Sequence, residues 1–213
     1  MVFVKSRERA RAAVSPLFLC AVVLIPQLCG KTWVLLFALA AFLHECGHLL
    51  ALRLLRGRVE GLNFRLSGAE IRYRSGSLSY GGEVVLALAG PGVNLFCALL
   101  AAAAARTHPD GTLYRFIGCH LVLALFNLLP ALPLDGGRVL QAALEARFPM
   151  EGELYARRVS RGVGAALLLP GLFVLLKSGN PTLFSAGGVI LLRSGAKRTL
   201  HLPEKLLKYK FKL

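Results

Sequence analysis

Residues 32–55 read TWVLLFALAAFLHECGHLLALRLL, an apolar stretch long enough to cross a bilayer that also contains two histidines and a glutamate. A membrane-spanning helix needs about 20 apolar residues, and ionisable side chains at that depth are costly unless they are paired or bind a metal. His44 and His48 are four positions apart, so they share one helix face, and Glu45 lies one step around the helix. This HExxH pattern is typical of zinc hydrolases, in which two imidazoles bind the metal and the glutamate acts on water.

The rest of the chain is also apolar. Of its 213 residues, 55% are hydrophobic and 17% are charged, and the mean hydropathy is +0.60. These values exclude a disordered chain, and five cysteines within apolar runs do not suit a disulfide scaffold. We predict an all-α polytopic membrane protein with about six transmembrane helices. The candidate spans run over residues 14–30, 32–55, 83–105, 112–134, 162–177 and 181–192.

The net charge of +15 would also suit a nucleic-acid-binding protein. However, the charges lie between the apolar stretches instead of forming one face. If the N-terminus is cytoplasmic, 22 of the 26 lysines and arginines fall on the cytoplasmic side, as the positive-inside rule predicts. Topology and contact with anionic lipid headgroups therefore explain the charge, and no nucleic-acid partner is expected.

This topology also gives a domain organisation. We expect a multi-pass protein of the cell membrane with a basic cytoplasmic N-terminus over residues 1–13. A membrane core follows over residues 14–195, and a basic cytoplasmic tail over residues 196–213.

Two segments outside the spans have patterns of their own. Apolar and polar residues alternate over residues 62–66 and again over residues 69–74, on either side of Ser67 and Gly68. Period-two alternation around a turn pair predicts a small β-hairpin after the second helix. Residues 139–160 are interpreted as an amphipathic interfacial helix that Pro149 stops.

A catalytic zinc usually has three protein ligands, so the HExxH pair needs a third. The candidates are Glu83, which opens the third span, His120 in the fourth span, and Asp135, which closes it. Two prolines and two glycines surround Asp135 within residues 127–138. Such irregular backbone is tolerated at membrane depth only where protein lines a cavity, which favours Asp135. It also falls in the same cytoplasmic half as His44. His120 is interpreted as a hydrogen-bonded packing residue.

Three motifs in this order resemble those of the site-2 protease family of intramembrane zinc metalloproteases, particularly the branch of the stage IV sporulation protein FB. They are HECGH at residues 44–48, LAGPGVN at residues 88–94 and NLLPALPLDGGR at residues 127–138. The resemblance implies a zinc metalloendopeptidase, and the charge rule puts its active site toward the cytoplasmic side. It also implies that the chain cleaves a membrane-associated regulatory protein, as in regulated intramembrane proteolysis.

The resemblance further implies roles for individual residues. The implied Zn²⁺ ligands are His44, His48 and Asp135. Glu45 is implied as the catalytic acid and base, and Asn127 as a contact of the substrate or the developing oxyanion. Gly90 and Asn94 are implied to form a close helix contact beside the site.

The expected partners are the lipid bilayer, a membrane-tethered substrate such as a sigma-factor precursor or an anti-sigma factor, and regulatory membrane proteins. Two alternatives would use the same zinc-binding residues: a membrane zinc transporter and a catalytically silent zinc-binding adaptor. A transporter more often has paired half-helices in two repeats, and none is visible in this sequence. A silent adaptor would be expected to lack Glu45 or a ligand.

Overall fold

The computed structural model describes residues 11–14, 31–56, 59–65, 68–73, 78–179 and 187–191. Within these ranges the helices are α2 (Lys31–Leu54), α3 (Tyr80–Ala105), α4 (Gly111–Asn127), α5 (Asp135–Arg147) and α6 (Gly152–Ser178). The strands are β1 (Arg11–Val14), β2 (Val59–Arg65) and β3 (Gly68–Tyr73). Residues 187–191 form a further helical segment.

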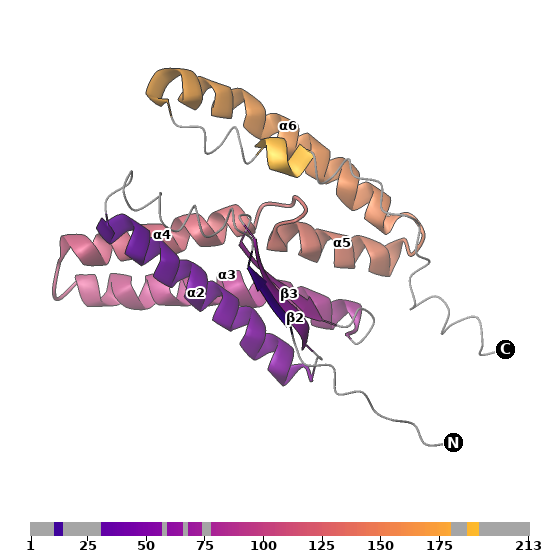
Figure 1. Cartoon of the computed structure of the whole chain (residues 1–213), viewed down its shortest axis with the longest axis horizontal. Helices are drawn as coiled ribbons and strands as arrows, with labels where there is room; N and C mark the ends of the chain where they lie inside the picture. The colour runs from indigo at the N-terminus through magenta and orange to yellow at the C-terminus, as the bar shows by residue number, and fades with distance from the viewer. Residues whose placement is uncertain are drawn as a thin grey trace.

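Helix α3 is the central element of the helical part. It packs against α2, α4 and α5, while α6 packs against α5 (Figure 1). The buried face of α3 is rich in small residues, namely Gly82, Ala87, Gly90, Ala98, Ala101 and Ala105. Small side chains let helix backbones approach closely. In lipid, where the hydrophobic effect does not drive helices together, they associate through such close packing. Consequently α3 holds α2 and the start of α5 on neighbouring surfaces.

Three helices of the described part, α2, α3 and α6, are long and apolar enough to cross a membrane. Large apolar side chains are exposed on them. Leu35 and Leu54 of α2 are 69% and 73% exposed, and Leu169 and Leu176 of α6 are 76% and 77% exposed. Exposed apolar area of this extent is unfavourable in water and neutral in lipid. The predicted spans 32–55 and 83–105 coincide with α2 and α3, and the predicted span 162–177 lies within α6.

The structure does not confirm the other three predicted spans. Residues 15–30 and most of residues 181–192 lie outside the described residues. The predicted span 112–134 is too long, because α4 ends at Asn127. Pro130 cannot donate a backbone hydrogen bond and disfavours helical geometry in the residue before it, so the chain leaves the helix earlier.

Two further boundaries differ from the predictions. Asp135 opens α5 and does not close the preceding helix. Residues 139–160 do not form one helix, because α5 ends at Arg147 and α6 begins at Gly152. Pro149 lies between them and, as predicted, no helix continues through it.

The strands form one sheet in the order β1-β2-β3. Strands β2 and β3 are antiparallel, with Leu62 opposite Ile71, and occupy the stretch in which the alternating pattern predicts a hairpin. Strand β1 pairs with β2 in parallel, with Ala12 opposite Leu62. This third strand was not predicted, because four residues are too short for a period-two signal and the partner is distant in sequence.

Candidate metal centre

His44 and His48 lie on the buried face of α2, and each is 5% exposed. Their positions one turn apart bring the rings together, with centroids 4.8 Å apart. Asp135, the first residue of α5, is 6% exposed and reaches the same point. Among the described residues, His44, His48 and Asp135 are the only group of histidines, cysteines and acids that could hold a metal ion.

The three ligand atoms have the spacing of a zinc site. Nε2 of His44 lies 3.1 Å from Oδ2 of Asp135 and 3.1 Å from Nε2 of His48, and the latter lies 3.3 Å from the same oxygen. Zinc bonds of about 2.0–2.2 Å put the ligand atoms of a tetrahedron about 3.3–3.5 Å apart. Three electron-pair donors this close repel one another unless a cation or protons lie between them. The donor set therefore fits Zn²⁺.

A backbone contact sets the protonation of His48. Its Nδ1 lies 2.8 Å from the carbonyl oxygen of Leu86, which can only accept a hydrogen bond. Nδ1 therefore donates, and in the neutral ring Nε2 keeps its lone pair. A second ring nitrogen that is anchored in this way is usual for metal-binding histidines.

Two glycines make room for the site. A Cβ atom at Gly90 of α3 would lie 2.7 Å from Nε2 of His44 and even closer to Nε2 of His48. A Cβ atom at Gly47 of α2 would lie 2.7 Å from the carbonyl oxygen of Ala89. The close helix contact that the family resemblance implies for Gly90 is thus confirmed, and it brings the α3 backbone against both imidazoles.

The loop before α5 is held against its neighbours. The backbone N–H of Leu132 donates to Oγ of Ser160 on α6 at 2.8 Å, and this hydroxyl donates to the carbonyl oxygen of Ala156 at 2.7 Å. Gly136 and Gly137 belong to the stretch in which the sequence predicts irregular backbone. Instead they lie in the first turn of α5, where any Cβ would overlap the backbone of residues 128–132. Their role is close packing that fixes the start of α5.

Glu45 and Asn127 are not among the three donors. Glu45 is half-buried, follows His44 on α2 and is not a member of the donor group. Asn127 is also half-buried, and its Nδ2 donates to the carbonyl oxygen of Leu123 in the last turn of α4 at 2.9 Å. Glu83, one of the candidate third ligands, is likewise outside the group.

His120 is a fully buried, hydrogen-bonded residue, as predicted. Its partner is Asn94 on α3, which also contacts Nδ1 of His44. This link between the two histidines was not anticipated from the sequence. A helical spacing of four places Asn94 on the same face as Gly90, which is the signal that could have indicated this contact.

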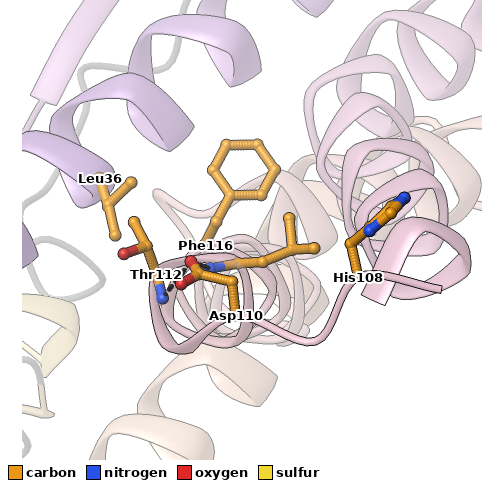
Figure 2. A pocket seen from close by; sticks show the side chains of 6 residues that line it. Leu36, His108, Asp110, Thr112 and Phe116 are labelled. Carbon is orange, nitrogen blue, oxygen red and sulfur yellow. Dashed lines mark hydrogen bonds between the residues drawn. The ribbon is translucent and has the colours of Figure 1, made fainter. Parts of the chain in front are cut away.

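A hollow of about 400 Å³ lies elsewhere in the molecule (Figure 2). Its walls are Leu36, His108, Asp110, Thr112, Leu113 and Phe116. None of these residues belongs to the donor group, and the hollow is at the opposite end of α4 from Asn127. We therefore do not associate this hollow with metal chemistry.

Comparison with known proteins gives consistent relatives. Residues 103–171 match the model of peptidase family M50, a range that includes Asn127 and Asp135. A protein from Synechocystis sp. that is assigned as a zinc metalloprotease is 33% identical over 153 residues, which are 65% of this chain and 40% of that protein. A zinc metalloprotease from Methanocaldococcus jannaschii is 28% identical over 146 residues, which are 64% of this chain and 41% of that protein.

The chain therefore spans about two fifths of the length of these two relatives. Among solved structures, the site-2 protease from Methanocaldococcus jannaschii matches with a TM-score of 0.64 and 22% identity. The match covers 87% of this chain and 89% of that one, so the two share a fold. The chain is thus similar to peptidase family M50 over residues 103–171, and it shares its fold with a site-2 protease.

Proposed function

We propose that this chain is an intramembrane zinc metallopeptidase that hydrolyses a peptide bond of a membrane-associated protein. The observation that carries the proposal is that three donor atoms meet within 3.3 Å. Two of them come from α2, a helix long and apolar enough to cross a membrane, and one comes from the start of α5. His44, His48 and Asp135 would hold the zinc ion. A fourth position would stay open for water or the substrate, as in other catalytic zinc sites.

Glu45 would act as general base and then as general acid. When bound, zinc would polarise the scissile carbonyl and lower the pKa of the attacking water. Glu45 would accept the proton of that water and deliver it to the leaving amine, which needs one carboxylate near one water. Its position beside His44, outside the donor group, suits this role because a ligating carboxylate would be less available to carry a proton.

Asn127 would donate a hydrogen bond to the oxyanion that forms during hydrolysis. Its Nδ2 now donates to the carbonyl oxygen of Leu123, so this role needs a rotation of the side chain upon substrate binding. Loss of a comparable oxyanion donor costs about 3 kcal/mol of transition-state stabilisation.

The substrate would be a membrane-tethered regulator such as a sigma-factor precursor or an anti-sigma factor. The distribution of 22 of the 26 lysines and arginines supports a multi-pass protein of the cell membrane with a cytoplasmic N-terminus. The same orientation would put the metal centre toward the cytoplasmic side.

The test combines metal analysis with cleavage assays in detergent, using a panel of candidate tethered substrates. The Glu45→Gln variant should bind zinc like the wild type and cleave no substrate, whereas His44→Ala should lose both properties. Cleavage by Glu45→Gln at the wild-type rate would remove Glu45 from the mechanism. Zinc uptake into vesicles without proteolysis by the wild type would favour the transporter alternative.

A further inference from the structure

A chain of polar side chains leads away from the metal centre across three helices. Asn94 of α3 lies between His44 of α2 and His120 of α4, with its amide 3.2 Å from Nδ1 of His44 and 3.2 Å from Nδ1 of His120. Asn94 and His120 are both 0% exposed. Polar groups this deep are retained where their hydrogen bonds have a role, because packing alone is better served by apolar side chains.

Metal binding dictates the direction of these hydrogen bonds. A histidine that binds zinc through Nε2 carries its proton on Nδ1, and this N–H needs an acceptor. Among the described residues the hydrogen-bond partner of Nδ1 of His44 is Asn94, and the structure places the amide nitrogen Nδ2 there, which suits an unprotonated Nδ1. Zinc on Nε2 would put the proton on Nδ1, so metal binding requires the amide to turn over and present its oxygen to this N–H. An amide oxygen and nitrogen have the same shape, and their orientation follows from the hydrogen-bond network.

The same orientation assigns a role to His120. In the structure Oδ1 of Asn94 lies 3.2 Å from Nδ1 of His120. With the amide turned over for zinc binding, Nδ2 would take the place of Oδ1 and donate to Nδ1 of His120. The ring of Phe116 packs against His120, with centroids 4.2 Å apart, and restricts the ring of His120. No protein group of the described residues is bonded to Nε2 of His120, so its one hydrogen bond is to Asn94. An apolar residue here would leave the amide without a partner that fixes its orientation.

We propose that Asn94 is a positioning residue that orients His44 for zinc, and that His120 fixes the orientation of the Asn94 amide. This proposal rests on the zinc ligation proposed above. Neither residue touches the metal or the substrate, so both act on metal affinity through His44. Loss of such an outer hydrogen bond lowers metal affinity about 10- to 100-fold.

The experiment measures zinc affinity by competition with a chelator, together with the melting temperature of the metal-free protein. Asn94→Leu should bind zinc about 10- to 100-fold more weakly than the wild type. Asn94→Asp keeps an acceptor for the N–H of His44 and should restore the affinity. His120→Phe should weaken binding less than Asn94→Leu, and the double variant should bind no more weakly than Asn94→Leu alone.

A matched control is Cys119→Ala, because Cys119 is buried beside His120 on α4 but lies outside the hydrogen-bonded chain. It should leave zinc affinity unchanged. Wild-type affinity in Asn94→Leu would overturn the role of Asn94, and multiplied losses in the double variant would overturn the link through His120. Wild-type zinc affinity in His44→Ala would instead overturn the proposed ligand set, so the two failures are distinguishable.

Discussion

Nε2 of His44 lies 3.1 Å from Oδ2 of Asp135, although 91 positions separate the two residues in the chain. The contact joins the middle of α2 to the first residue of α5, and α3 packs against both helices. A buried imidazole and a buried carboxylate this close, together with His48, would stabilise a cation bound between them.

The first prediction concerns the third ligand. Asp135→Ala should abolish stoichiometric zinc binding, because two imidazoles alone leave the ion without a charged ligand. The matched control is Glu83→Gln, which changes another acidic candidate outside the donor group and should retain zinc. Metal content after dialysis checks both. Full zinc occupancy in Asp135→Ala would exclude this residue as a ligand.

The second prediction concerns the space beside the imidazoles. Gly90→Ala should prevent zinc binding, because the new Cβ would lie 2.7 Å from Nε2 of His44. The Cβ of Gly92→Ala, two residues further along α3, would meet no atom within 4 Å. This control should bind zinc like the wild type. Equal zinc affinity in the two variants would contradict the close approach of α3 to the site.

The third prediction concerns the support of the loop before α5. Ser160→Ala removes the acceptor of the Leu132 N–H and should lower the free energy of unfolding by about 1–3 kcal/mol. Zinc affinity should fall as well, because the start of α5 loses an anchor. Thr107→Ala removes an exposed hydroxyl bond and should change stability by less than about 0.5 kcal/mol. Thermal melting in detergent and chelator competition measure the two effects.

The fourth prediction concerns the start of α4, at the hollow of Figure 2. The backbone N–H groups of Leu113 and Thr112 donate to the Asp110 carboxylate and lower its pKa from 3.8. A lowered pKa in the folded state means that the ionised carboxylate stabilises the fold above pH 3.8. Asp110→Ala should therefore melt below the wild type at pH 7, since the helix loses its N-cap.

The difference between Asp110→Ala and the wild type should shrink as the pH falls below 3.8 and through the lower folded-state pKa. Melting of the metal-free proteins over this pH range checks the sign, because zinc loss then cannot contribute. A difference that grows toward low pH would contradict the capping role of the carboxylate.

The sequence by itself determined the features that depend on local spacing. The four-residue separation of His44 and His48 fixes both rings on one face of a helix, whatever surrounds it. The prolines after Asn127 ended α4, although the predicted span ran too far. The position of Asp135 within this irregular stretch was sufficient to favour it over Glu83 and His120 as the third donor.

Only the tertiary structure decided which distant groups meet. The pairing of β1 with β2 and the link from His44 through Asn94 to His120 join segments from different parts of the chain. Spacing along one helix can place Asn94 on the face of Gly90, but it does not show which distant histidines this face meets, because such contacts depend on how closely whole helices and strands approach. Small residues such as Gly90 permit that approach, and its geometry is set by the packing of α3 against three neighbouring helices.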